Sequence, residues 1–329
     1  MKRILATTAI LALSAGFASA EVTLSGDARM GIIGGDGVDT AFTSRARVKF
    51  SMSGETDGGL EFGASFRADN AKAITTQTTN VSPGADLVLG TADDIVTVSS
   101  STTGGANAGT AGEVHISGAF GKLSMGDVDG AAQSAVGQVS GVGLTGLGDL
   151  NEIAYLGAGS GPASEPALFN GSDPTALYEY STGAFTGYVS VTDPGNGLGA
   201  DAMAIGAKYS TDTFTVALGY EQLDIEAIGF ELDHIVLGVT GTFGAITAKA
   251  VYGQLGGNFT SSTSDQYSMS VDYVADALTV TAFFGKDFGD NDRYGVGAAY
   301  DLGGGASVVG GYADIEGASA FDLGISMSF

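Results

Sequence analysis

The sequence contains no cysteine, few basic residues and only two histidines. Without cysteine, neither a disulfide bond nor thiol chemistry is available. The 13 lysine and arginine residues stand against 37 aspartate and glutamate residues, which gives a formal net charge of −24. Because a phosphate backbone requires clustered basic side chains, this balance argues strongly against nucleic acid as a partner.

Long apolar runs are missing after the first twenty residues. Residues 1–20 have a basic start, an apolar centre and the small-residue ending Ala18-Ser19-Ala20, which together predict an export signal that is cleaved before Glu21. Its removal leaves 11 basic residues against 37 acidic ones, a net charge of −26. No later apolar run approaches the ~20 residues of a membrane-spanning helix. Any passage through a membrane must therefore use strands, and in lipid only a closed barrel leaves no unpaired edge.

What the sequence has instead is an alternation of apolar and polar side chains from residue 21 onward, as in its last ten residues, AFDLGISMSF. Successive side chains of a strand point to opposite faces, so this period of two predicts strands. One face is apolar and the other carries charged and hydroxyl side chains. Such a sheet suits lipid on one side and water on the other.

About sixteen such segments follow one another, joined alternately by short turns and longer loops. This layout is typical of an outer-membrane barrel, and sixteen strands enclose an aqueous channel. We therefore predict an all-β fold, a transmembrane antiparallel β-barrel of about 16 strands over residues 21–329. The five prolines support this map because all lie in or beside predicted long loops, where no ladder hydrogen bond is needed: Pro83, Pro162, Pro166, Pro174 and Pro194.

Two of the predicted loops are unusually long, at residues 70–112 and 128–173, and loops of this length are usually functional or disordered. Tyrosine is unevenly distributed, since all twelve tyrosines lie at or beyond Tyr155. Many have outward parity at strand ends, as in the aromatic girdles of membrane barrels. We expect the later strands to face lipid and the first few, which lack outward tyrosine, to face a neighbouring subunit; a simple drift in composition is the alternative.

Basic residues gather on three consecutive predicted strands with inward parity: Arg29, Arg45, Arg47, Lys49 and Arg67. With Ile33 opposite Thr43, we expect Arg29 to lie opposite Arg47, and with Met52 opposite Leu60, we expect Arg45 to lie opposite Arg67. Directly opposed like charges destabilise a sheet, so this basic wall indicates a function.

An acidic group facing the basic wall would offset the repulsion between its side chains. The loop at 128–173 and the residue preceding it supply the candidates: Asp127, Asp129, Asp149, Glu152, Glu165 and Asp173. Folded into the lumen, this loop would narrow the channel and place carboxylates across from the basic wall. Charged rings of this kind set the ion preference of pores.

Four stretches carry a resemblance to a known family: EVTLSGDARMGII, SRARVKFSMSGETDGGLEFGASFRAD, GAFGKLSMGD and DLGGGASVVGGYAD. The sequence resembles general diffusion porins of Gram-negative outer membranes, in particular their Rhodobacter-type branch, over essentially its whole length. The resemblance implies a sixteen-stranded barrel, a homotrimer surrounded by outer-membrane lipid and lipopolysaccharide, and a third extracellular loop bent inward as an eyelet at Val128 to Asp173. It also implies that Phe329 is the terminal aromatic presented to the barrel assembly machinery.

The expected function is passive diffusion of small hydrophilic solutes and ions, with a weak cation preference from the acidic excess. An enzyme is disfavoured because His115 and His234 lack a neighbouring Ser–Asp pattern. A substrate-specific channel is the alternative, but the inward aromatics Tyr188 and Phe283 are too few to form a ladder along the lumen. No cofactor is required; in the 70–112 loop, Asp86, Asp93 and Asp94 offer oxygen ligands of the kind that Ca²⁺ prefers, without the spacing of an EF-hand.

Overall fold

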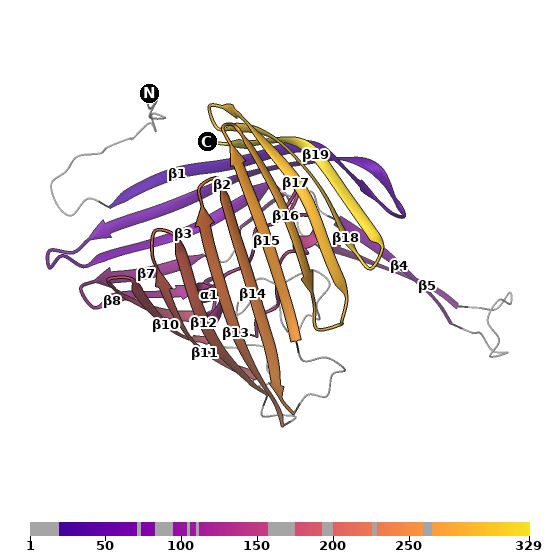
Figure 1. The fold of residues 1–329 in the computed structure, drawn as a ribbon. Helices are drawn as coiled ribbons and strands as arrows, with labels where there is room; N and C mark the ends of the chain where they lie inside the picture. Colours follow the sequence, from indigo (N-terminus) through magenta and orange to yellow (C-terminus); the bar gives the residue numbers. More distant parts are fainter. Residues whose placement is uncertain are drawn as a thin grey trace.

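The alternating segments form one continuous antiparallel sheet in the computed structural model of the chain (Figure 1), which describes residues 20–70, 74–82, 95–103, 106–109, 112–156, 175–192, 200–225, 229–258 and 265–329. Sixteen strands form the wall of a barrel. In chain order they are β1 (Glu21–Gly35), β2 (Val38–Glu55), β3 (Glu61–Asn70), β7 (Glu113–Gly118), β8 (Gly121–Gly126), β9 (Thr175–Thr182), β10 (Phe185–Thr192), β11 (Ala200–Ser210), β12 (Phe214–Ile225), β13 (Phe230–Phe243), β14 (Ile246–Gly257), β15 (Asp265–Ala275), β16 (Leu278–Lys286), β17 (Asp292–Gly303), β18 (Ala306–Ile315) and β19 (Ala318–Ser328).

The barrel is closed by pairing of its first and last strands. β1 pairs with β19 from Asp27, opposite Ser328, to Gly35, opposite Ala320. Gly26 and Phe329 then exchange backbone hydrogen bonds of 3.2 and 2.9 Å. Closure pairs the two edge strands of the described barrel wall with each other, which is the condition for crossing lipid with strands. The predicted sixteen-stranded antiparallel barrel is confirmed.

Short turns gather at one end of the barrel, as predicted, between β2 and β3, β7 and β8, and at each later connection of this parity. One connection at the opposite end differs from expectation. We expected a loop between residues 33 and 43, but β1 and β2 continue to a tight turn at Asp36-Gly37, where Gly37 takes a φ of +70° that favours glycine. The two strands are therefore longer than the sequence pattern indicated.

The region 70–112 also contains more strand than expected. A separate hairpin of β4 (Ile74–Ser82) and β5 (Ile95–Thr103) extends away from the barrel (Figure 1), and the short β6 (Ala106–Gly109) pairs with the end of β3. The threonine- and valine-rich sequences of β4 and β5 have high strand propensity. The five prolines lie outside the described residues.

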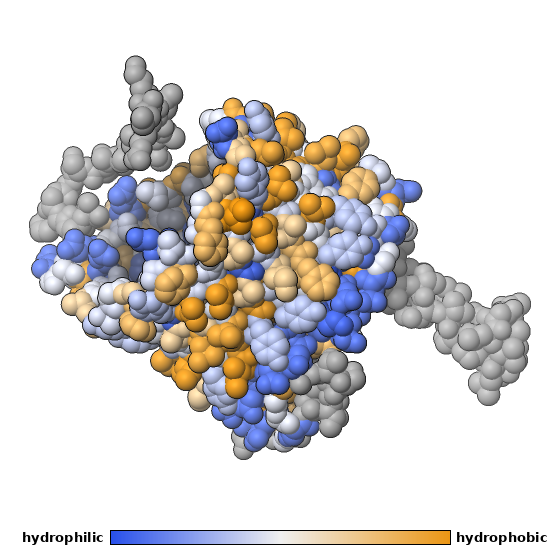
Figure 2. Space-filling model, viewed as in Figure 1, coloured by the Kyte–Doolittle hydropathy of each residue, from blue (hydrophilic) through white to orange (hydrophobic). Residues whose placement is uncertain are grey.

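The parity predicted from the sequence holds along the strands. On β12, Val216 and Leu218 point outward and are 40% and 53% exposed, whereas Glu221 points inward and is buried. Apolar residues cover the outer face of the strands nearest the viewer in Figure 2. Outward tyrosines are exposed: Tyr180, Tyr220, Tyr252, Tyr273, Tyr300 and Tyr312. Tyr180, Tyr273 and Tyr300 lie near strand ends, as expected for girdles, whereas Tyr220 and Tyr252 lie in the middle of β12 and β14. The outer face of the barrel is therefore suited to hydrocarbon and the inner face to water.

Among the described residues, no helix is both long enough and apolar enough to cross a membrane. The two helical segments are short, α1 (Ala131–Val136) and the 3₁₀ turn η1 (Leu147–Asp149). Both belong to the segment between β8 and β9, which lies inside the barrel.

Candidate functional site

The segment that we call loop 3, residues 127–156, lies inside the barrel. It comprises Asp127 and the described part, 128–156, of the predicted constriction loop. Its helix α1 packs on the inner face of β10–β13. Glycines there leave room for the helix backbone: a Cβ at Gly219 would stand 2.6 Å from Ala132 Cβ, and one at Gly238 would stand 2.8 Å from Val136 Cγ1. Inward glycine on adjacent strands thus makes a shallow seat for α1.

Hydrogen bonds fix the first part of loop 3, from Ala131 to Ser140, to the barrel wall. Ser190 on β10 accepts a hydrogen bond from the backbone N–H of Ala131 at 2.8 Å. Lys249 on β14 donates to the carbonyl of Val136 at 2.7 Å. Ser140 donates to Asp272 on β15 at 2.7 Å. These three contacts carry loop 3 around the wall from β10 to β15.

The tip of loop 3 reaches β19 and β1. Asp322 on β19 accepts hydrogen bonds from the backbone N–H groups of Leu144 and Thr145 at 2.8 and 2.6 Å, and from the hydroxyl of Thr145 at 2.7 Å. Arg29 on β1 donates to the carbonyl of Leu144 at 3.3 Å. A buried carboxylate with three donors holds the tip firmly, because hydrogen bonds to charged groups are among the stronger ones.

After its tip, loop 3 runs back along its own first part, and side chains bind this returning limb to the segment that precedes the tip. The amide of Gln138 exchanges two hydrogen bonds with the backbone of Ile153, at 2.8 and 2.9 Å. The Tyr155 hydroxyl donates to the carbonyl of Gly137 at 3.0 Å. Apolar side chains complete the packing between loop and wall: Ala131, Ala132, Val136, Val139, Val142, Ile153, Tyr188, Val236, Val251 and Phe283. Tyr188 and Phe283 therefore have the predicted inward parity but lie in this packed layer.

The five residues of the predicted basic wall share the inner face of β1–β3, but the expected register was wrong. Arg29 lies opposite Arg45, and Lys49 lies opposite Arg67. The tight β1–β2 turn moves the pairing of β1 with β2 by two residues, so that Ile33 faces Ala41. The pairing of β2 with β3 differs from expectation by four residues, so that Met52 faces Ala64. Parity survives any even shift, so the side chains keep their face while their partners change.

Carboxylates within the basic wall relieve its repulsion, which the sequence analysis missed. Arg47 lies opposite Asp27 on one side and Asp69 on the other. Asp69 forms ion pairs with Arg47 at 3.0 Å and Arg67 at 2.7 Å, and Asp27 forms one with Arg45 at 2.8 Å. Lys49 is exposed. Both aspartates have the same inward parity as the arginines, and that signal was available in the sequence.

The predicted acidic residues divide into two groups. Asp127 and Asp129 lie at the start of loop 3, and Asp149 lies in η1 and is exposed. Glu152 is on the returning limb, where its carbonyl accepts a hydrogen bond from Arg293 at 2.9 Å. Glu165 and Asp173 lie outside the described residues, as do the possible Ca²⁺ ligands Asp86, Asp93 and Asp94.

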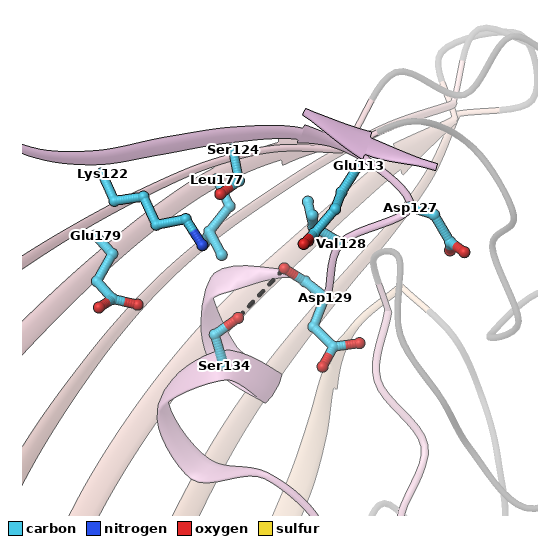
Figure 3. Close-up of a pocket in the computed structure, with 9 residues that line it drawn as sticks. All are labelled: Glu113, Lys122, Ser124, Asp127, Val128, Asp129, Ser134, Leu177 and Glu179. Carbon is cyan, nitrogen blue, oxygen red and sulfur yellow. Dashed lines mark hydrogen bonds between the residues drawn. The ribbon is translucent and has the colours of Figure 1, made fainter. Parts of the chain in front are cut away.

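Beside α1, Asp127 and Asp129 line a pocket together with other charged residues of the barrel wall. The pocket, of about 270 Å³, is lined by Asp127 and Asp129 and by side chains from β7–β9. Figure 3 shows the Ser134 hydroxyl bonded to the Asp129 carbonyl, at 3.3 Å, and Asp127 directed away from Lys122. Sequence reasoning did not single out the charged residues that β7–β9 contribute, although their inward parity was readable: Glu113, Lys122 and Glu179.

Desolvation raises the pKa of three groups on loop 3. The pKa of Asp129 is raised by desolvation and, to a lesser degree, by the charge of Asp127. Desolvation also raises the pKa of Asp149. The pKa of Tyr155 is raised mainly by its burial and further by the nearby carboxylates, Glu221 first among them. The two aspartates therefore gain a proton at a higher pH than ordinary aspartates do.

A closed sixteen-stranded barrel, apolar outside and charged within, with a loop fixed across its inner wall, defines a channel of the outer-membrane type. The comparisons with known proteins agree. The model of the Gram-negative porin family matches residues 6–319. A porin of Rhodobacter capsulatus is 36% identical over 94% of this chain and 100% of its own length.

Solved porin structures have the same fold. One refined porin structure is 35% identical, with a TM-score of 0.69 over 94% of this chain and all of its own. A Rhodopseudomonas blastica porin triple mutant matches with a TM-score of 0.67 over 94% of this chain and 100% of its own, at 23% identity, which bears on the fold alone. The chain belongs to the Gram-negative porin family. It is an outer-membrane porin, a channel for passive diffusion.

Proposed function

We propose that loop 3 and the basic wall form a charged eyelet, and that this eyelet gives the channel a weak cation preference. The observation that carries the proposal is the pairing of wall arginines with wall aspartates. Arg45, Arg47 and Arg67 are engaged by Asp27 and Asp69, so much of the positive charge of the wall is offset locally.

The acids near α1 are compensated less completely than the arginines. The pocket beside α1 is lined by four carboxylates, those of Glu113, Asp127, Asp129 and Glu179, and by one amine, that of Lys122. Asp149 adds a further exposed carboxylate on the returning limb. Along a water-filled passage between these two surfaces, the carboxylates without a nearby basic partner outweigh the basic groups without a nearby acidic partner. A lining with this excess of negative charge attracts cations.

A salt gradient across a planar bilayer tests the preference. The purified protein is expected to give a reversal potential of the sign that favours cations. Replacing both Arg45 and Arg47 with glutamate should move it further in that direction, because two wall cations become anions. Lys286→Glu is the matched control, since Lys286 pairs with Asp290 near the strand end rather than in the basic wall. A reversal potential that favours anions would overturn the preference, and an unchanged value in the double variant would remove Arg45 and Arg47 from the eyelet.

We further propose a homotrimer that uses the outer face of β1–β3. This face is apolar and without tyrosine, with Leu24, Met30 and Phe42 exposed at 56%, 52% and 93%. Because the chain has no cysteine, a single Leu24→Cys variant can be cross-linked without background. The expected result is a trimer mass in detergent and cross-linked chains in the native membrane. A monomer mass would contradict the trimer.

Export and membrane insertion complete the proposal. Residues 1–20 act as a cleaved signal, the outer face contacts lipid and lipopolysaccharide, and Phe329 is recognised by the barrel assembly machinery. Mass spectrometry of the mature protein tests the first point, with Glu21 expected as its first residue. A substrate-specific channel is less well supported, because Tyr188 and Phe283 are buried in the layer between loop and wall.

A further inference from the structure

A buried polar cluster joins the returning limb of loop 3 to three strands of the wall. Its members are Glu221 on β12, His234 on β13 and Gln266 on β15, all at most 1% exposed. Glu221 accepts a hydrogen bond from the backbone N–H of Leu156 at 3.0 Å. Gln266 accepts one from the N–H of Ala154 at 2.9 Å and donates one to the carbonyl of Ala154 at 2.8 Å. The cluster thus holds the limb by its backbone.

The two bonds to Ala154 fix the orientation of the Gln266 amide, and through it the protonation of His234. One N–H of Gln266 goes to the Ala154 carbonyl, and its nitrogen also lies 3.1 Å from Nε2 of His234. The remaining N–H is therefore donated to Nε2, which must be unprotonated to accept it. At the other side of the ring, Nδ1 lies 2.9 Å from Glu221 and donates to it. The described arrangement requires a neutral His234 with its proton on Nδ1.

The surroundings of His234 leave little room for another arrangement. Tyr155 of loop 3 and Phe288, between β16 and β17, approach the ring edge-on at 6.1 and 5.8 Å. Gly253 on β14 lies against Nε2, where a Cβ would overlap the ring nitrogen. Glu221 is the acid in contact with the ring, and Tyr155 is the titratable group on loop 3 that faces it. The neighbouring segments also carry Glu152 on the limb, Arg293 on β17 and the buried Asp287, which precedes Phe288.

We propose that Glu221, His234 and Gln266 are positioning residues that hold loop 3 in its open-channel position, and that protonation of His234 releases residues 154–156. A proton on Nε2 would face an N–H of Gln266, and turning the amide to accept it would break both bonds to Ala154. The tip would stay bound to Asp322. The inference rests on loop 3 being the constriction proposed above.

Single-channel recording of the whole protein at about pH 7.5 and about pH 5 tests the proposal, since an ordinary histidine changes charge between these values. We expect the fully open level to be occupied less in acid. His234→Asn keeps a donor toward Glu221 but does not titrate, and should show no such loss. Gln266→Met removes the bonds to Ala154, and should show the loss already at about pH 7.5. His115→Asn, on β7, is the matched control and should behave as the unaltered protein.

A second measurement follows the limb itself. Leu156→Cys introduces a thiol at a side chain that is 3% exposed, in a chain without native cysteine. Its modification rate, relative to that of a lumenal Thr23→Cys thiol, should rise in acid and should not rise when His234→Asn is added. The proposal is overturned by an open level that ignores pH, by an acid response that persists in His234→Asn, or by an unchanged relative rate at Leu156→Cys. The reversal potential at about pH 7.5 reports on the charge of the eyelet and not on the release of residues 154–156. Failure of the eyelet proposal would appear as a reversal potential that favours anions, whereas failure of the present proposal would appear in the pH dependence of the open level.

Discussion

Asp322 of β19 receives both the backbone N–H and the hydroxyl of Thr145, at 2.6 and 2.7 Å, and so ties the tip of loop 3 to the seam of the barrel. A carboxylate is suited to this because it accepts hydrogen bonds only. The same side chain also accepts from Leu144. The position of the loop tip therefore depends on a contact between residues 177 positions apart in the sequence.

Asp322→Asn should loosen this tip. The amide keeps one accepting oxygen and turns an NH₂ group toward a donor, and losing hydrogen bonds to a charged acceptor costs about 1.5–3 kcal/mol. We expect larger or noisier single-channel currents while the barrel still forms. Asp36→Asn is the control, because Asp36 also accepts one N–H and one hydroxyl, both from Ser319, but in an exposed turn. Equal currents in the two variants would contradict the anchoring role.

Asp69→Asn should shift ion preference toward anions. Asp69 pairs with both Arg47 and Arg67, so its loss leaves two arginines of the wall without that counter-charge. A unit charge about 4 Å away in water is worth about 1 kcal/mol, so the cation-to-anion permeability ratio should fall by up to about fivefold. Reversal potentials measure the shift. Asp290→Asn removes an equivalent partner from Lys286, and should leave the ratio unchanged.

Gly219→Ala should disturb the seat of α1. The added Cβ would stand 2.6 Å from Ala132 Cβ, and overpacking of this kind costs about 1–3 kcal/mol. We expect a lower temperature of barrel unfolding together with altered conductance. Gly187→Ala, on β10, adds the same methyl group where nothing lies within 4 Å, and should change neither. A Gly219→Ala protein that matches this control would show that α1 does not rest on β12 as described.

Acid should weaken the cation preference in a step that depends on Asp129. Its pKa is raised by desolvation and by Asp127, so it loses its negative charge at a higher pH than an ordinary aspartate. Asp129→Asn should remove this part of the pH profile of the reversal potential, and Asp57→Asn, in an exposed turn, should not. A pKa raised above that of the unfolded chain also means that the folded state binds the proton more tightly. The free energy of unfolding therefore gains from this group as the pH falls through its pKa.

The sequence predicted the faces of the strands far better than their partners. Parity placed Arg29, Arg45, Arg47, Lys49 and Arg67 on one inner surface, and the structure agrees. The opposed pairs were wrong because alternation is unchanged by a shift of two or four residues. The β1–β2 turn fixes the first shift and the β2–β3 turn the second, and the turn residues Asp36 and Gly37 were not used to set the first.

The contacts of loop 3 were beyond the sequence pattern for a different reason. Parity indicates that Asp322, Gln266 and Glu221 point inward, but it does not say what an irregular segment 65 to 178 positions away brings to meet them. The inward glycines on β12 and β13 were a readable sign of close packing. These glycines indicate where another segment packs closely against the strands, but they do not identify that segment as α1.

The seam between β1 and β19 has a consequence for biogenesis. Gly26 and Phe329 bond to one another across almost the whole length of the chain, so the first strand has no final partner on that side until the last one has been made. Pairing so distant in sequence is slow, because the intervening chain must first be brought together. A ribosome-bound or truncated chain that lacks β19 would keep two open edges, and a periplasmic chaperone would have to shield them until translation and export are complete.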